Sequence, residues 1–271
     1  MMWPLSSKTK PEPRPLPPRR VIDEESPART INLDKLASPA WRAQEAHNTQ
    51  VLDAMLRKVR ALDAFRPVDC VLFTGDVIDN NQINELQWFL RVVEGGSVLP
   101  NSGSLEDPLA GAGNDPHDAF TAAGLGTIPW YAALGNHDGL IQGNLPHGKL
   151  LGYSLVTGDP TRDSVASLSL GRVNTPTCNP LHKDAAQAPP RCMPTHPSKL
   201  GSGSLPADKD REHLTRKEWI KAVRAAKGMP AGHGLAASHE SSGVADFVVD
   251  PVPGLPLRLV VLDTLSPIGA Q

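Results

Sequence analysis

The chain lacks several features that define whole classes of protein. No run of 18 apolar residues occurs among its 271 residues, so the sequence predicts no membrane-spanning helix. Three cysteines are too few for a disulfide framework. A formal net charge of −2 gives no reason to expect binding to nucleic acid or to an anionic membrane surface. With two tyrosines and five phenylalanines, the core must be filled by Leu, Val and Ala. These absences favour a soluble globular chain.

The first 20 residues also lack something, namely the apolar segment of a secretory signal peptide. We therefore expect a cytoplasmic protein, with export of a longer form left open. Five prolines between Pro11 and Pro18 predict a disordered, extended tail over residues 1–20. Pro15 to Arg20 fits a PxxPxR pattern, so an alternative is a binding module that docks this tail on SH3-type grooves. Residues 21–271 are predicted to form one domain.

Two similar stretches carry the chemistry of the chain. Val68 to Phe73 is an apolar run of strand length, followed by Gly75 and the carboxylates of Asp76 and Asp79. Ile128 to Leu134 is a second such run, followed by Gly-Asn-His-Asp. We expect the two strands to be adjacent and parallel, so that both motifs lie at the carboxyl ends, where ligands bind in open α/β sheets. Oxygen donors and an imidazole at that position indicate a divalent metal site for phosphate chemistry.

Each motif has a simpler interpretation when taken alone. A Gly-Asp pair after a strand is commonly just a turn, and Gly-Asn-His-Asp can be an ordinary loop. Their occurrence in this order, each after an apolar run and separated by a predicted helix, favours the functional interpretation.

The stretches GDVIDN (75–80) and GNHD (135–138) resemble the second and third signature blocks of the calcineurin-like metallophosphoesterases. The resemblance covers about residues 21–264, and three further segments are similar to a bacterial subgroup of the family: Val21–Arg29, Trp41–Glu45 and Pro230–Gly234. It implies an α/β fold, a sandwich of two mixed β-sheets flanked by helices.

The resemblance also implies roles for five residues. Asp76 would be the carboxylate that bridges two metal ions, and Asn136 an amide ligand to one of them. His137 would be the acid that protonates the leaving oxygen or steadies the phosphate, with Asp138 orienting its ring. Asp79 would lie behind these groups without contacting the metal.

The implied activity is hydrolysis of a small phosphomonoester or phosphodiester with two divalent ions such as Mn, Fe or Zn. The family's Asp-x-His block is expected just before Val21 and its Gly-His-x-His block near the end of the chain, but neither occurs there. A wrong start or frame slip in the gene model and a real loss both account for this. The alternative to an active hydrolase is therefore a catalytically impaired fragment or pseudoenzyme of the same fold. Two oxygen donors without further ligands predict weak metal binding.

The remaining chain is predicted to alternate helices with two loop-rich insertions, at 97–127 and 139–214. Three helices are expected. The first begins at Ser38-Pro39 and carries an apolar stripe of Val51, Met55, Val59 and Leu62, with Leu52 and Leu56 beside it. The second covers residues 82–94, and the third runs from the Thr215 capping box to about Ala226. Residues 246–250 and 257–264 are predicted to form a hairpin whose second strand is fully buried.

Several polar residues have open interpretations. Asp115-Pro116-His117 is a weak substitute for the missing Asp-x-His. Cys178 and Cys192 could form a disulfide in an exported protein or join a zinc site, although their spacing favours free thiols. Cys70 is expected to be buried in its strand. His233 and His239 are each either structural or directed toward substrate.

Overall fold

The computed structural model describes residues 47–101, 116–141, 143, 146 and 209–265. Its helices are α1 (Asn48–Phe65), α2 (Ile83–Glu94), α3 (Asn136–Gly139), α5 (Arg216–Ala225) and α6 (Ala237–Ser242), with 3₁₀ turns η4 (Lys209–Arg211) and η5 (Ala231–Gly234). Its strands are β1 (Val71–Phe73), β2 (Gly96–Val98), β3 (Phe120–Ala122), β4 (Trp130–Ala132), β5 (Phe247–Val249) and β6 (Leu259–Val261). The predicted α/β class is confirmed. The predicted tail 1–20, the start of the first helix before residue 47 and both late cysteines lie outside the described residues.

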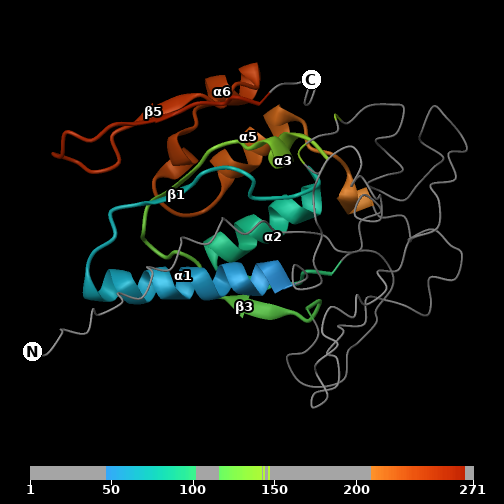
Figure 1. The fold of residues 1–271 in the computed structure, drawn as a ribbon, viewed down its shortest axis with the longest axis horizontal. Helices are drawn as coiled ribbons and strands as arrows, with labels where there is room; N and C mark the ends of the chain where they lie inside the picture. Colours follow the sequence, from blue (N-terminus) through green and yellow to red (C-terminus); the bar gives the residue numbers. More distant parts are fainter. Residues whose placement is uncertain (1–46, 102–115, 142, 144–145, 147–208, 266–271) are drawn as a thin grey trace, which may run out of the picture.

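Strands β1 and β4 form the centre of the described fold. They pair in parallel, with Val71 opposite Trp130 and Phe73 opposite Ala132. The adjacent, parallel arrangement expected from the two motifs is therefore confirmed. Figure 1 shows this pair between α1 and α2 on one side and the β5–β6 hairpin with α5 and α6 on the other. Because the strands run in the same direction, the loops that follow them reach the same edge.

Strand β1 is less buried than its apolar sequence predicts. Leu72 is 40% exposed, and Cys70 is a half-buried free thiol that precedes the strand, so the prediction of a buried strand containing Cys70 is wrong. By contrast, all of β4 is buried. Partial burial raises the pKa of the Cys70 thiol, and the neighbouring Asp69 charge acts in the same direction.

Helix α1 buries only part of the predicted apolar stripe. Leu52 and Leu56 are buried and Val59 packs on the core, as predicted, whereas Met55 and Leu62 are 40% and 49% exposed. Polar contacts on a neighbouring face account for the difference: the Asp53 carboxylate accepts the N–H of Ala123 at 2.7 Å, and Arg57 donates to the carbonyl of Thr121 at 2.8 Å. The helix therefore turns its Asp53 and Arg57 side toward β3.

Helix α2 supplies most of the core on one side of the β1–β4 pair. The prediction of a helix ending at Gly95 is confirmed, since Gly95 closes it with φ 86°. Its buried apolar residues are Leu86, Trp88, Phe89, Val92 and Val93. Phe89 meets Phe73 of β1 edge to face, with ring centroids 5.1 Å apart.

The segment predicted as a loop over 97–127 contains two strands, so that prediction is wrong where the segment is described. Strand β2 pairs antiparallel with β3, with Ser97 opposite Thr121. Each strand has only three residues, which is too short to produce a visible alternation of apolar and polar residues.

The capping box before α5 is confirmed. The Thr215 hydroxyl accepts the N–H of Glu218 at 3.2 Å, and Glu218 accepts the N–H of Thr215 at 2.8 Å. The helix then buries Trp219, Ile220 and Val223. None of the helices in the described part of the chain is long and apolar enough to cross a membrane.

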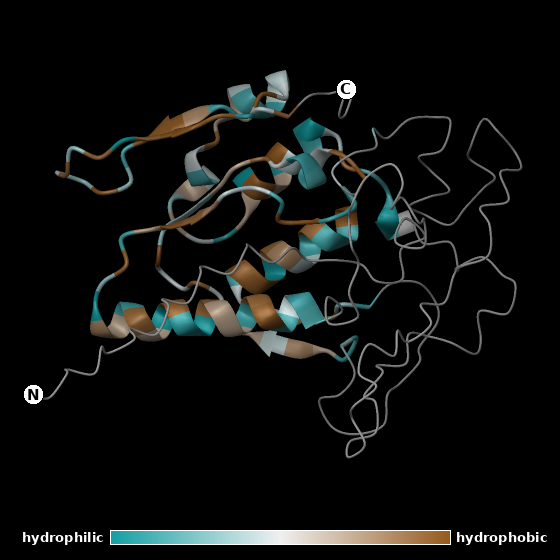
Figure 2. Cartoon of the chain, in the orientation of Figure 1, coloured by the Kyte–Doolittle hydropathy of each residue, from teal (hydrophilic) through white to brown (hydrophobic). Residues whose placement is uncertain are grey.

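The β5–β6 hairpin is confirmed, but its burial is not as predicted. The strands are antiparallel, with Val248 opposite Val260. Val261 is 7% exposed, whereas Val260 and Leu262 are about 60% and 61% exposed, so the prediction of a fully buried second strand is wrong. The hairpin lies at the margin of the described fold with one face inward, and Figure 2 shows its apolar residues in brown.

His233 is structural, the first of its two expected interpretations. Its side chain is fully buried and stacks on Trp130, with ring centroids 3.6 Å apart. Nδ1 lies 3.1 Å from the carbonyl of Trp130 and Nε2 lies 3.1 Å from that of Ala226. Burial lowers the pKa of the ring and outweighs the carbonyls, which favour its charged form. His233 therefore joins β4 to the end of α5.

The lowered pKa of His233 predicts that the protein loses stability in mild acid. The ring binds a proton more readily in the unfolded state. The contribution of neutral His233 to the free energy of unfolding is therefore complete above the unfolded pKa of about 6.5, and it is lost as the pH falls toward and through the pKa of the folded state. We expect the free energy of unfolding to fall between pH 7.5 and 5.5 by a larger amount in the wild type than in His233→Leu. The measurement is urea unfolding at both pH values, and an equal pH dependence in the two proteins would contradict the prediction.

Candidate active site

The loops that follow β1 and β4 touch at two glycines. A Cβ atom on Gly135 would lie 2.2 Å from the backbone nitrogen of Asp76, and one on Gly75 would lie 2.9 Å from the Cα of Gly135. Gly75 also has φ +96°, which side chains rarely adopt. Glycine at both positions lets the two loops approach closely enough for their polar residues to bond one another.

Asp76 is held in an uncommon backbone conformation at this junction. Its φ is 53°, in the left-handed region that is sparsely populated by residues other than glycine. Its N–H donates to Oδ2 of Asp138 at 2.9 Å, and its Oδ1 accepts the N–H of His137 at 3.0 Å. Backbone strain maintained by such contacts clusters at functional sites.

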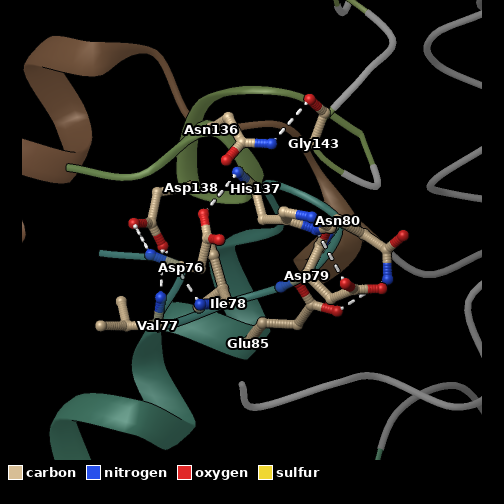
Figure 3. A network of polar contacts seen from close by, with 10 residues as sticks. All are labelled: Asp76, Val77, Ile78, Asp79, Asn80, Glu85, Asn136, His137, Asp138 and Gly143. Carbon is tan, nitrogen blue, oxygen red and sulfur yellow. Dashed lines mark hydrogen bonds and ion pairs between the residues drawn. The ribbon is translucent and has the colours of Figure 1, made fainter. Parts of the chain in front are cut away.

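Asp138 joins the two loops through backbone hydrogen bonds. Besides Asp76, its carboxylate accepts the N–H groups of Val77 at 2.9 Å, Ile78 at 3.1 Å and Gly135 at 2.7 Å, several of which are drawn in Figure 3. Its side chain is almost completely buried. Burial raises the pKa of Asp138 to about 7, while the amide donors act in the opposite direction. Asp138 therefore links the loop after β1 to the loop after β4.

The His137 ring is contacted by Asp79. Nδ1 of His137 lies 2.9 Å from Oδ1 of Asp79 and 3.2 Å from its carbonyl oxygen. Both side chains are buried. The expectation that Asp138 orients the ring is therefore wrong: the Asp138 carboxylate is occupied by backbone amides, and Asp79 takes that position. This arrangement directs the other ring nitrogen, Nε2, away from Asp79.

Asn136 presents its amide near the same junction. Its Nδ2 donates to the carbonyl of Gly143 at 2.9 Å, which directs Oδ1 the other way (Figure 3). Gly143 also lies against the His137 ring, since a Cβ there would be 2.5 Å from Nε2. Asn136 is exposed, unlike His137 and Asp138.

The donors suit a hard divalent cation but make only part of a complete site. Asp76 and Asn136 offer a carboxylate and an amide oxygen, the ligand types that such ions accept. Across the described ranges, no group of three or more His, Cys, Asp or Glu is arranged to hold a metal ion. Asp76 and Asn136 fit the chemistry of oxygen ligands to such an ion, which would need further ligands.

Sequence reasoning missed the buried polar residues behind Asp79. Glu85 of α2 accepts the backbone N–H groups of Asp79 and Asn80 at 3.2 and 2.8 Å, and Nδ2 of Asn80 at 3.0 Å. Asn81 donates from Nδ2 to the carbonyl of Asp138 at 2.5 Å. The available signal was the group of amide side chains at 80–82 and 84, followed by a glutamate in the first turn of a helix.

His239 makes its hydrogen bond in another part of the chain. The imidazole of His239 accepts the backbone N–H of Ala236 at 2.8 Å at the start of α6. His117 lies in a turn before β3, and Asp115 of the same Asp-x-His lies outside the described residues. Cys178 and Cys192 lie there too, so their redox state stays a prediction.

Comparison with known protein families identifies the chain's family. A family model described as calcineurin-like phosphoesterase matches residues 46–250, which is more than half of the chain. No curated protein and no solved structure matches significantly. The matched range contains both glycine motifs and the whole of the junction between β1 and β4.

Proposed function

Because the chain belongs to the calcineurin-like phosphoesterase family, we propose that the junction after β1 and β4 hydrolyses a small phosphomonoester or phosphodiester. Members of this family generally act as metal-dependent hydrolases. The observation that carries the proposal is the hydrogen bond from the His137 N–H to the Asp76 carboxylate, which brings the second and third family motifs into one site.

In this proposal Asp76 and Asn136 would provide oxygen ligands to the metal ions. Bound divalent ions would supply Lewis acidity and a water molecule of lowered pKa. Asp76 supplies the negative charge, and Asn136 orients its oxygen through the bond to Gly143. The identity of the metal among Mn, Fe and Zn is part of the test below.

His137 is proposed to transfer a proton to the leaving oxygen. The transfer requires the protonated ring: Asp79 holds the hydrogen on Nδ1, and the hydrogen on Nε2 goes to the leaving oxygen. Asp79 is a positioning residue for the ring. Asp138 maintains the distance between the motifs through its amide contacts.

The test compares substrates with good and poor leaving groups. Chelator-treated protein is assayed with an aryl phosphate, an aryl phosphodiester and an alkyl phosphate, with Mn²⁺, Fe²⁺ or Zn²⁺ added. We expect metal-dependent hydrolysis, and we expect His137→Ala to lower kcat/KM on the alkyl ester by about 10²-fold, the contribution typical of a general acid. Its effect on an aryl ester with an acidic leaving group should be about tenfold smaller, because that oxygen needs no proton.

His239→Ala is the matched control, because His239 caps α6 and lies outside the site. It should leave all rates unchanged. If His137→Ala lowered kcat/KM equally on both ester types, the role of His137 in proton transfer would be contradicted. Turnover that persists after chelator treatment without added metal would contradict the metal dependence.

A second candidate function is favoured because the described residues contain no group of three or more His, Cys, Asp or Glu side chains that could hold a metal ion. In this alternative the chain keeps the family fold and binds phosphate esters with little turnover. Titration calorimetry with Mn²⁺ separates the two. Tight metal binding that is lost in Asp76→Ala supports the hydrolase, whereas weak binding that Asp76→Ala leaves unchanged supports the impaired form.

A further inference from the structure

Glu85 is a buried carboxylate that no part of the proposed chemistry uses directly. It lies in the first turn of α2, and its side chain is fully buried. A buried carboxylate is costly unless hydrogen-bond donors surround it. Here Oε2 accepts the backbone N–H groups of Asp79 and Asn80, and Oε1 accepts Nδ2 of Asn80. All three donors belong to the loop that carries Asp79.

These contacts form a continuous path from α2 to the His137 ring (Figure 3). Glu85 fixes the peptide units of Asp79 and Asn80. Asp79 in turn places its carbonyl and its carboxylate within 3.2 and 2.9 Å of Nδ1 of His137. Two acceptors aimed at one ring nitrogen favour a hydrogen on that nitrogen. The position of the Asp79 backbone therefore decides which ring nitrogen carries the proton in the neutral form.

Helix α2, which carries Glu85, is packed in the core. Leu86 and Phe89, which follow Glu85 on α2, are each no more than 2% exposed. A carboxylate in the first turn is also favoured by the helix dipole. The backbone position of Glu85 is therefore set by the packing of α2 in the core.

We propose that Glu85 is a positioning residue that holds Asp79 against Nδ1 of His137 and so fixes the hydrogen on Nδ1 and the orientation of the ring. The consequence for catalysis rests on the proposed function, whereas the effect on the ring does not. A purely structural Glu85 would contribute to stability and leave the tautomer of His137 unchanged.

The structure also predicts which substitution preserves the effect. In Glu85→Gln the amide oxygen can take the place of Oε2 and keep both backbone contacts. Its NH₂ group then faces Asn80, whose Oδ1 has no hydrogen-bond partner within the described residues. Rotation of the Asn80 amide converts that oxygen into an acceptor for the new NH₂ group. In Glu85→Asp the carboxylate is one methylene too short to reach both amides, and in Glu85→Ala it is absent.

The first measurement is the ¹H–¹⁵N spectrum of the histidine rings in metal-free protein at neutral pH. The His137 signals are assigned by their loss in His137→Gln. We expect hydrogen on Nδ1 in the wild type and in Glu85→Gln, and an at least fivefold larger share of the Nε2–H form in Glu85→Asp and Glu85→Ala. Glu94→Gln is the matched control, because Glu94 is the last residue of the same helix and accepts the N–H of Lys227 at 3.0 Å.

The second measurement is the ratio of kcat/KM for aryl and alkyl phosphates. Glu85→Asp should raise this ratio at least fivefold, in the same direction as His137→Ala, and Glu85→Gln should restore it. An unchanged His137 tautomer in both Glu85→Asp and Glu85→Ala overturns the proposal, and Glu85→Asp keeps the test valid where Glu85→Ala does not fold. A shifted tautomer in a protein without turnover supports the role of Glu85 and contradicts the hydrolase function alone.

Discussion

Asp76→Asn is expected to lower metal-dependent phosphoester hydrolysis by about 10³-fold, which corresponds to about 4 kcal/mol of transition-state stabilisation. The substitution removes one negative charge and keeps the size of the side chain. In the proposed site that charge is what holds the divalent ions. Removing it weakens both metal binding and the stabilisation of charge on the transferring phosphoryl group.

The same substitution is expected to leave the fold almost unchanged. Asparagine adopts the left-handed conformation with φ near the observed 53° as readily as aspartate does. Its Oδ1 can still accept the N–H of His137, as the Asp76 carboxylate does at 3.0 Å. The free energy of unfolding should therefore change by less than about 1 kcal/mol.

This pair of expectations separates catalysis from a capping role for Asp76. If the carboxylate only accepted the His137 N–H, the amide oxygen would serve equally well and the rate would persist. Asp69→Asn provides the control, because Asp69 is an exposed aspartate shortly before β1. It should keep the wild-type rate. Retained turnover in Asp76→Asn would show that the carboxylate is structural.

The sequence predicts the central pair of strands well because each motif carries its own local signal. An apolar run followed by glycine and a polar residue identifies β1 and β4, and their shared pattern predicts the parallel pairing. The capping box before α5 is equally local. These features depend on residues within a few positions of one another.

What the sequence does not predict depends on contacts between distant segments. Asp138 and Asp79 both lie near His137 in the motifs, and only the three-dimensional arrangement shows that Asp79 contacts the ring. Burial of β6 was overestimated because an apolar run gives no information on whether one face or two are covered. Strands β2 and β3 were missed because their pairing, rather than their composition, defines them.

Gly135→Ala is the second substitution with a large expected effect, a loss of about 3 kcal/mol in the free energy of unfolding. Gly135 has φ −96°, which any residue adopts, so its own backbone conformation does not require glycine. The requirement comes from across the junction. A methyl group would lie 2.2 Å from the backbone nitrogen of Asp76 and 2.3 Å from its Oδ1.

Neither neighbour can move away without breaking other contacts. The Asp76 nitrogen is bonded to Asp138, and Oδ1 accepts the N–H of His137. Separating the loops would also strain the bond from the Gly135 N–H to Asp138 at 2.7 Å. We therefore expect phosphoesterase activity to fall along with stability, because the motif residues would no longer share one site.

Gly254→Ala is the control that isolates the effect of contact from that of conformation. Gly254 has φ +81° and nothing within 4 Å of a Cβ atom, so the substitution introduces conformational strain alone, at a cost of about 1 kcal/mol. Chemical unfolding of the two variants should thus rank Gly135→Ala as the more destabilised, and thermal unfolding should show its melting temperature lowered by roughly 6–12 °C for a chain of this size. A smaller loss in Gly135→Ala than in Gly254→Ala would mean that the loops after β1 and β4 are not in close contact in solution. The shared site, and with it the assignment of Asp76 and Asn136 to one metal centre, would then be wrong.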